Sequence, residues 1–282
     1  MIADLHRHTD FSLFDGFGKP LDLARLAKSY GYEALGITDH GTASGLVEHY
    51  LACKEVGIKP ILGVEAYFQP VFNKEKKRFH LCIFVKNLTG YRNMCRMLSY
   101  ANIHNYYYKP IITFELLEKY HEGIMVSTAC VAGYPAQMIV NGKVKMAEKF
   151  VRRTQKIFGD DFYIEIQPYK LSKLGLQESI NEYLMAIAKK YEVKCIMTSD
   201  SHFGKEEDLD TYVKMHELRN HEGVEKTYRE RYMPKPNDFR IRFNKMHKDN
   251  PWFTAKEIYE AMEELVDKCD DDILGNLTLT LP

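Results

Sequence analysis

Imidazole, carboxylate and thiol side chains recur where short apolar runs of this sequence end, and together they could bind metal ions. The tightest spacings are His6-Arg7-His8 and Asp200-Ser201-His202. Because side chains i and i+2 of a strand share a face, both imidazoles of the first pair can reach one ion. The full set of nine candidate ligands is His6, His8, Asp15, His40, Glu65, His80, Cys130, Asp200 and His202.

Such a set is suited to the hydrolysis of a phosphoester. Neighbouring metal ions lower the pKa of a bridging water, orient the phosphate and stabilise the leaving oxygen. Mixed nitrogen, oxygen and sulfur ligands suit Zn²⁺, and the carboxylates also accept Mn²⁺ or Fe²⁺. We expect Glu65, Asp200 and His202 to take part in catalysis, with a hydroxide near Glu65 attacking phosphorus in line. Nucleophilic attack by Cys130 is the alternative chemistry, but metal ligation would occupy its thiolate.

Each of these residues taken alone is weak evidence for a metal site. A single histidine or aspartate at the end of a strand is usually a capping or core residue, and a cysteine in an apolar run is usually a core thiol. The joint pattern carries the prediction, because six of the seven predicted strands bear a metal-capable group in one face-consistent arrangement. We expect Asp39 and Glu165, which also lie near strand ends, to support the ligands or the fold rather than to bind an ion.

The remaining histidines and cysteines have no arrangement that indicates ligation. The histidines fall on predicted helices or in polar loops, where we expect them to face solvent: His49, His104, His121, His216, His221 and His247. The cysteines are far apart and form no CxxC pair, which favours buried thiols over a disulfide framework: Cys53, Cys82, Cys95, Cys195 and Cys269.

Short apolar runs alternate with stretches of helical periodicity along most of the chain. The runs predict seven strands: Ile2–His8, Ala34–His40, Pro60–Tyr67, His80–Lys86, Gly123–Cys130, Phe162–Gln167 and Lys194–His202. The periodic stretches predict helices: Leu21–Tyr30, Gly45–Glu55, Tyr91–Ala101, Phe114–Tyr120, Val144–Phe158 and Leu176–Tyr191. This alternation is typical of parallel βαβ units, so we predict an α/β fold with a closed or nearly closed barrel. Barrel enzymes keep their active sites at the carboxyl ends of the strands, where most of the candidate ligands fall.

The alternation of predicted strands and helices stops after His202. We therefore divide the chain into a barrel, residues 1–205, and a C-terminal extension, residues 206–282. Lys205–Asn220 is predicted to be helical, and Glu222–Pro236 is polar and typical of a loop. Apolar residues at helical spacing predict a further helix over Thr254–Lys268. We expect this extension to pack on the barrel.

Bulk composition describes a globular chain without a predicted membrane segment. Of 282 residues, 45% are hydrophobic and 28% charged, and no apolar run approaches the roughly 20 residues that span a bilayer. The N-terminal residues do not form a secretion signal, which favours the cytoplasm. The formal net charge is zero, whereas strong non-specific duplex binding normally needs a basic surplus. Any contact with nucleic acid should therefore be local and single-stranded.

Several segments resemble one known family. His6-Arg7-His8-Thr9-Asp10-Phe11-Ser12-Leu13-Phe14-Asp15-Gly16 resembles the opening motif of the PHP (polymerase and histidinol phosphatase) domain, most closely that of bacterial replicative DNA polymerase III alpha subunits. The resemblance continues in Ile37-Thr38-Asp39-His40-Gly41, in 57–67, in 87–91, in Tyr107-Tyr108-Lys109-Pro110, in Ser127-Thr128-Ala129-Cys130 and in Ser199-Asp200-Ser201-His202. It covers essentially the whole predicted barrel.

The resemblance implies a distorted seven-stranded (β/α) barrel that holds up to three divalent metal ions. On the family's pattern, His6, His8, Glu65 and Asp200 hold one ion. The second ion is shared through Glu65 with His80 and Cys130, and the third lies between Asp15, His40 and His202. Every one of these positions carries a competent ligand here. Cysteine at position 130 resembles the polymerase branch of the family, whose small-molecule phosphatases often have histidine there.

The resemblance also extends to 261–269 and to Leu281-Pro282, which are similar to the segment just before the polymerase palm. The polymerase machinery itself does not follow, so we do not expect this chain to synthesise DNA. A DNA polymerase or another replisome protein is an expected partner. The cytoplasm of a bacterial cell, or of a phage-infected bacterial cell, is the expected location.

Three functions remain open on the sequence alone. The polymerase-like motifs favour a 3′–5′ exonuclease acting on single-stranded or frayed DNA, as in proofreading. The alternatives are a phosphatase for a small phosphomonoester and a non-catalytic module that docks on a separately encoded polymerase. For DNA, Tyr107 and Lys109 could stack a base beside a phosphate, and Lys19 could contact phosphate, although the tyrosines could equally serve packing.

Overall fold

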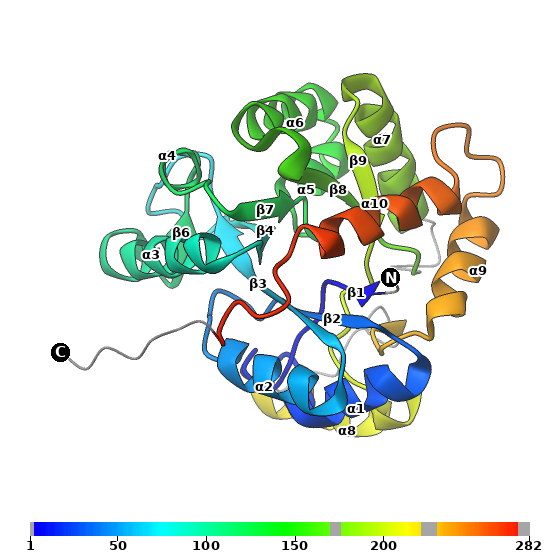
Figure 1. Cartoon of the computed structure of the whole chain (residues 1–282). Helices are drawn as coiled ribbons and strands as arrows, with labels where there is room; N and C mark the ends of the chain where they lie inside the picture. Colours follow the sequence, from blue (N-terminus) through cyan, green and yellow to red (C-terminus); the bar gives the residue numbers. More distant parts are fainter. Residues whose placement is uncertain (1–2, 170–175, 221–229, 276–282) are drawn as a thin grey trace.

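The computed structural model describes residues 3–169, 176–220 and 230–275, which are built around one curled β-sheet (Figure 1). Its strands are β1 (Ala3–Asp4), β2 (Ala34–Ile37), β3 (Lys59–Phe68), β4 (Phe79–Val85), β5 (Tyr106–Tyr107), β6 (Lys109–Ile112), β7 (Ile124–Ser127), β8 (Phe162–Ile166) and β9 (Lys194–Met197). Seven of them follow one another in the order β1-β2-β3-β4-β7-β8-β9. Strand β6 pairs with the end of β3 and with β5, so this short hairpin lies off the main path.

The two ends of the seven-strand path come together. Beyond the last residues of β1 and β9, a parallel bridge joins Arg7 to Ser201, and the N–H of His8 donates to the carbonyl of Ser201 at 2.8 Å. The sheet thereby curls into a distorted barrel, and the predicted α/β fold class is confirmed.

The direction of β4 differs from the prediction. Strands β1, β2 and β3 pair in parallel, as do β7, β8 and β9, but β4 runs antiparallel to both β3 and β7. The expectation of parallel βαβ units throughout was therefore wrong at this strand. The reason is visible in the sequence, because no helical stretch separates the third and fourth apolar runs, and a short connection (69–78) reverses the chain.

Helices surround the sheet (Figure 1). They are α1 (Pro20–Tyr30), α2 (Leu46–Val56), α3 (Leu88–His104), α4 (Phe114–Lys119), α5 (Tyr134–Val140), α6 (Val144–Phe158), α7 (Leu176–Tyr191), α8 (Leu209–Asn220), α9 (Pro236–Met246) and α10 (Ala255–Asp267), with 3₁₀ turns at Gly159–Asp161 and Glu206–Asp208. The six helices predicted for the barrel are all present. Helix α5 and the β5–β6 hairpin were not predicted, because each is too short to display a clear period.

Local sequence explains where several helices begin and end. Proline occupies the first turn of α1, and Gly31 ends that helix at φ 87°, with its N–H bonded to the carbonyls of Ala27 and Lys28. At the start of α10, Thr254 and Glu257 form a reciprocal capping box.

The C-terminal extension contacts the barrel through α10, which packs on β9 and β1 (Figure 1). Ile258, Met262 and Leu265 point into the core from this helix and are buried. The boundary at residue 205 stays a prediction. The predictions for His221, for most of the 222–236 loop and for Leu281-Pro282 concern residues outside the described ranges. Among the described helices, none is both long and apolar enough to cross a membrane.

Three histidines that were expected to face solvent are buried instead. His49, His216 and His247 are 0%, 6% and 5% exposed, whereas His104 and His121 are exposed as predicted. His49 lies on the inner face of α2, where its Nε2 is 2.9 Å from the carbonyl oxygen of Leu35 on β2. The polarity of histidine does not predict its burial, because the residue type is the same whether the side chain faces the core or the solvent.

His49 should make the fold sensitive to acid. Burial, with a smaller contribution from the charge of Arg7, lowers the pKa of His49 from 6.5 to about 4. The folded state therefore holds His49 neutral, so its contribution to stability is full above pH 6.5 and is lost as the pH falls from 6.5 toward 4. Between pH 7.5 and pH 5.0 this amounts to about 2 kcal/mol.

The His49→Gln variant keeps an N–H donor for Leu35 but cannot titrate. We expect its free energy of unfolding, measured by urea denaturation with chelator present, to fall by about 2 kcal/mol less than that of the unmodified chain over this pH range. Equal losses in both proteins would contradict the assignment.

Candidate metal centre

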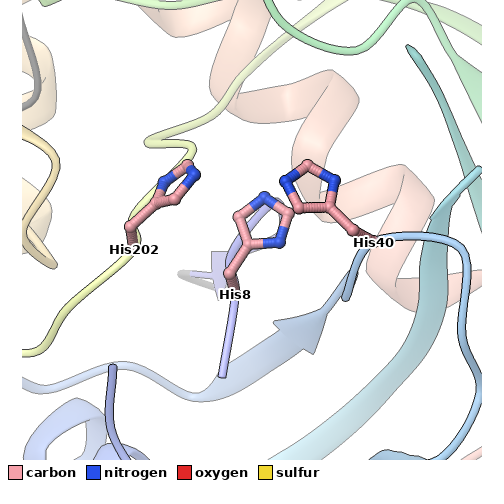
Figure 2. A group of neighbouring side chains, drawn as sticks. All are labelled: His8, His40 and His202. Carbon is pink, nitrogen blue, oxygen red and sulfur yellow. The ribbon is translucent and has the colours of Figure 1, made fainter. Parts of the chain in front are cut away.

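The structure brings the side chains of all nine predicted ligands to one end of the curled sheet. Figure 2 shows three of them, His8, His40 and His202, with their imidazole rings gathered together from three different strand ends. The ring centroids of His8 and His40 are 4.2 Å apart, and those of His8 and His202 are 4.4 Å apart. Residues separated by nearly 200 positions in the chain therefore share one small volume.

One group of donor atoms surrounds the end of β1. His6 Nε2 lies 3.3 Å from Glu65 Oε1 and 3.4 Å from Asp200 Oδ1. His8 Nε2 lies 3.5 Å from Glu65 Oε2 and 3.3 Å from Asp200 Oδ1. An ion with ligands at about 2.0 Å has roughly 3.3 Å between neighbouring ligand atoms, so each of these spacings suits two atoms that bind one cation.

A second group also includes Glu65. Glu65 Oε1 is 3.0 Å from His80 Nδ1, and Cys130 Sγ is 3.4 Å from that oxygen and 3.6 Å from the same nitrogen. The antiparallel course of β4 makes this meeting possible. His80 stands at the start of β4, and reversal of the strand brings that start to the edge where the parallel strands end, with Tyr67 opposite His80 in the register.

A third group is centred on Asp15. Asp15 Oδ2 lies 2.8 Å from His40 Nε2 and 3.9 Å from His202 Nε2. Burial alone would raise the pKa of Asp15, but its hydrogen bond to His40 and the charge of His202 hold that pKa well below its usual range. Burial and the neighbouring His8 lower the pKa of His202 to about 3, so this imidazole is neutral near pH 7 and keeps the lone pair that ligation requires.

Glu65 connects the three groups. Its carboxylate is fully buried and lies within 3.5 Å of imidazole nitrogens from His6, His8, His40 and His80. Burial alone would raise the pKa of Glu65, but the charges of His80, His6 and His40 more than offset this and hold it well below its usual range. Burial opposes the charge of His40, yet Glu65 and Asp15 raise the pKa of His40 to about 10. The centre thus carries buried negative charge that needs positive charge beside it, which protons or divalent cations can supply.

Further polar groups orient the first two histidines. Glu165 Oε2 lies 2.8 Å from His6 Nδ1 and accepts a hydrogen bond from Thr198, which leaves His6 Nε2 facing Glu65 and Asp200. Ser12 Oγ, which donates to Asp39, lies 3.1 Å from His8 Nδ1. Glu165 and Asp39 therefore occupy the supporting positions predicted for them, an arrangement common around metal-binding histidines.

Backbone strain is concentrated at this centre. Phe14, Ala129 and Asp200 have φ values of 58°, 57° and 49°, in the left-handed region that costs non-glycine residues about 1–3 kcal/mol each. Two of them directly precede Asp15 and Cys130, and the third is itself a predicted ligand. The strained backbone sets the direction of these side chains.

Three residues at the centre were not predicted. Arg231 from the C-terminal extension places Nη1 2.7 Å from Asp200 Oδ2, and His216 Nε2 lies 3.6 Å from Asp15 Oδ1. Cys82, for which the sequence indicated no ligation, pairs opposite Glu65 and has Sγ 3.3 Å from His6 Nδ1. The alternation of Cys82 with His80 along β4 was an available signal. Arg231 and His216 lie in the extension, where no sequence pattern tied them to the strand ends.

The three residues predicted to contact substrate lie in different places. Lys109 lies beside the centre, with Nζ 5.2 Å from the ring of Tyr67, and Tyr107 packs against Tyr108. Lys19 is exposed and directly precedes α1. All three roles stay predictions.

The donor set fits divalent cations. Imidazole nitrogens, carboxylate oxygens and the thiols of Cys82 and Cys130 lie close together. Among the described residues, four overlapping triplets of such atoms lie within 4.8 Å of one another: His8-His40-His202, His6-His8-Asp200, His6-Glu65-Cys82 and His40-Glu65-His80. A mixture of these donors is typical of Zn²⁺, Mn²⁺ or Fe²⁺ sites.

The family model of the PHP domain matches residues 4–169 of the chain. This chain belongs to the PHP domain family. The PHP chain is 41% identical over 219 residues to DNA polymerase III subunit alpha of Aquifex aeolicus, a match that covers 73% of this chain and 19% of that protein. The same subunit of Borreliella burgdorferi is 31% identical over 277 residues, covering 95% of this chain and 23% of that protein. The chain thus spans about a fifth of the length of these relatives.

A solved structure from Bifidobacterium adolescentis, described as a candidate metal-dependent phosphoesterase, has a similar fold. It is 17% identical, with a TM-score of 0.50, and the match covers 71% of this chain and 87% of that one. The likeness confirms the fold that the sequence predicted.

Glu65 offers a direct test of metal binding. Replacement by Gln keeps the size of the side chain but removes the charge that faces four imidazoles, so we expect the Glu65→Gln variant to retain at least one divalent ion fewer per chain after dialysis. Elemental analysis by mass spectrometry measures this. Glu118→Gln, at an exposed glutamate that pairs with Arg153, is the matched control and should bind as the unmodified chain does. Equal metal content in both variants would contradict the role of Glu65.

The pairing of Arg231 with Asp200 can be tested by a double-mutant cycle. Arg231→Met leaves the buried Asp200 carboxylate without this cation and should lower the free energy of unfolding by about 3 kcal/mol in the presence of chelator. Asp200→Asn removes the charge that Arg231 balances. The double variant should therefore lose at least about 1 kcal/mol less free energy of unfolding than the sum of the losses in the two single variants. Simple additivity of the urea-denaturation results would show that the pair does not interact.

Proposed function

We propose that this PHP chain is a metal-dependent phosphodiesterase that removes nucleotides from the 3′ end of single-stranded or frayed DNA. The observation that carries the proposal is the gathering of nine metal-capable side chains at one end of the sheet, where four imidazoles face the buried Glu65 carboxylate. The relatives named as DNA polymerase III alpha subunits favour DNA as the substrate, and proofreading is the context in which a polymerase-associated domain would shorten a 3′ end.

The proposed centre holds up to three ions of zinc, manganese or iron. His6, His8, Glu65 and Asp200 would hold one of them. Glu65, His80 and Cys130 would hold the second, and Asp15, His40 and His202 the third. Bound ions would supply an activated water near neutral pH and offset the negative charge of the phosphate.

The chain's own residues would prepare the reaction in three ways. Glu65, at the junction of the donor groups, fixes where the phosphate and the attacking water meet. Arg231 holds one oxygen of Asp200 at 2.7 Å, so that the other oxygen faces His6 and His8. His202, neutral because of its burial, is available as a ligand or as a proton acceptor beside Asp15.

The decisive experiment uses an oligonucleotide labelled at its 5′ end. In Mn²⁺, the unmodified chain should produce a ladder that shortens from the 3′ end. The Asp200→Asn variant should be slower by at least about 100-fold, since even partners of metal ligands cost 10–100-fold when altered. Chelator should abolish the activity in both proteins. Asp249→Asn, at an aspartate whose side chain is 88% exposed, is the matched control and should digest at the unmodified rate.

Other outcomes would replace the proposal. Digestion that survives in Asp200→Asn would indicate a contaminating nuclease. Release of phosphate from small monoesters without DNA digestion would assign a phosphatase. Metal binding without hydrolysis of either substrate, together with co-purification of a polymerase, would assign a docking module.

A further inference from the structure

A cavity of about 670 Å³ lies beside the candidate metal centre. Its wall is formed by the loop after β2, the end of β3, one face of α3 and the β5–β6 hairpin, and it includes His40, Tyr67, Asn102, Tyr106, Tyr108 and Lys109. The volume falls within the range of about 300–1,000 Å³ that is usual for ligand sites. Because His40 belongs to both, the cavity and the metal centre adjoin at this residue.

Tyr67 forms the wall between the cavity and the centre. Its ring stacks on His40 at 6.0 Å between centroids, with an interplanar angle of 17°, and meets His80 edge-on at 5.6 Å. This packing depends on Gly41, whose φ is 63° and where a Cβ would lie 2.8 Å from the Tyr67 ring. The backbone after His40 can therefore approach the tyrosine closely only because residue 41 has no side chain.

Cations gather on the aromatic rings of this cavity. The guanidinium of Arg78 lies 5.4 Å from the centroid of the Tyr67 ring, and Lys109 Nζ lies 5.2 Å from the same centroid. Lys76 Nζ lies 5.0 Å from the centroid of the Tyr108 ring. Since the chain as a whole carries equal numbers of basic and acidic residues, 39 of each, this is a local concentration of positive charge rather than a general one.

Two exposed tyrosines also line the cavity. Tyr106 and Tyr108 are 56% and 58% exposed, a high fraction for aromatic side chains. Tyr108 also has a φ of 60°, a strained conformation at the tip of the β5–β6 hairpin. Exposed aromatic faces interleaved with lysine and arginine are the combination by which proteins bind single-stranded nucleic acid, because bases stack on the rings while phosphates pair with the cations.

We propose that this cavity binds one base and one phosphate of a single-stranded DNA next to the bond to be cleaved. The base stacks on Tyr108 or Tyr106, and Lys109 with the 76–78 cations contacts the phosphate. The proposal rests on the function proposed above and adds to it the surface that recognises a polymer rather than a small phosphomonoester. It also replaces Tyr107, the tyrosine favoured on sequence, by its two neighbours, which line the cavity where Tyr107 does not.

The test measures DNA binding separately from hydrolysis. Fluorescence anisotropy with a labelled oligothymidylate, in chelator, reports binding by the full chain without cleavage. Tyr108→Asn removes the ring while keeping a residue that tolerates a positive φ, and Lys109→Gln removes one charge. Loss of one stacking contact should weaken binding about 5- to 100-fold for Tyr108→Asn. Lys109→Gln should reduce the slope of log K against log salt by about 0.7, as expected for one phosphate contact.

The matched controls are Tyr183→Asn, at a tyrosine on α7 that is 51% exposed, and Lys256→Gln, at a lysine on α10 whose side chain is 85% exposed. Both should bind the oligonucleotide as the unmodified chain does. In Mn²⁺, the ratio of kcat/KM for the oligonucleotide to kcat/KM for bis(4-nitrophenyl) phosphate should fall at least about fivefold in the cavity variants and stay constant in the controls.

The outcomes separate this inference from the proposed function. Oligonucleotide binding that weakens in the cavity variants supports the cavity even if no DNA is digested, in which case only the nuclease assignment fails. Digestion and binding that are unaffected by Tyr108→Asn and Lys109→Gln would overturn the cavity and leave the nuclease standing. An unmodified chain that hydrolyses bis(4-nitrophenyl) phosphate but binds no oligonucleotide would overturn both.

Discussion

The surrounding structure depends on the buried carboxylate of Glu65, whose charge must be balanced by neighbouring groups. A charge in a fully buried position is unstable unless opposite charge and hydrogen-bond donors lie against it, and here four imidazoles do so. Those imidazoles come from three separate strands or the segments that follow them. The curl of the sheet, the course of β4 and the placement of the loop after β2 therefore all serve to surround one oxygen pair with cation-binding groups.

Closure of the sheet and reversal of β4 bring different metal-capable groups to Glu65. The bridge between Arg7 and Ser201 brings the residues after β1 against those after β9, so that His8 and Asp200 come within 3.3 Å. Reversal of β4 brings a strand start to the edge formed by strand ends and adds His80. A sheet of only parallel strands would have placed that residue at the opposite end of the barrel.

The C-terminal extension completes the centre rather than merely covering the barrel. Arg231 reaches Asp200 and His216 reaches Asp15, while α10 packs its apolar face on β9 and β1. The cavity beside His40 is lined in part by the β5–β6 hairpin, whose strand β6 pairs with the end of β3. Tyr67 thus contacts His40 and His80 of the metal-capable groups as well as the cations Arg78 and Lys109, so the candidate metal centre and the cavity adjoin at this ring.

The sequence by itself determined the fold class, most helices and the nine metal-capable residues, because periodicity and the position of polar groups at strand ends are local signals. It also placed Glu165 and Asp39 beside the ligands. Only the tertiary structure decided the direction of β4, the burial of His49, the position of Arg231 beside Asp200 and the placement of Tyr106 and Tyr108 at the wall of the cavity. These depend on contacts between distant segments, and no local pattern of side chains reports which face of a helix or hairpin another part of the chain will cover.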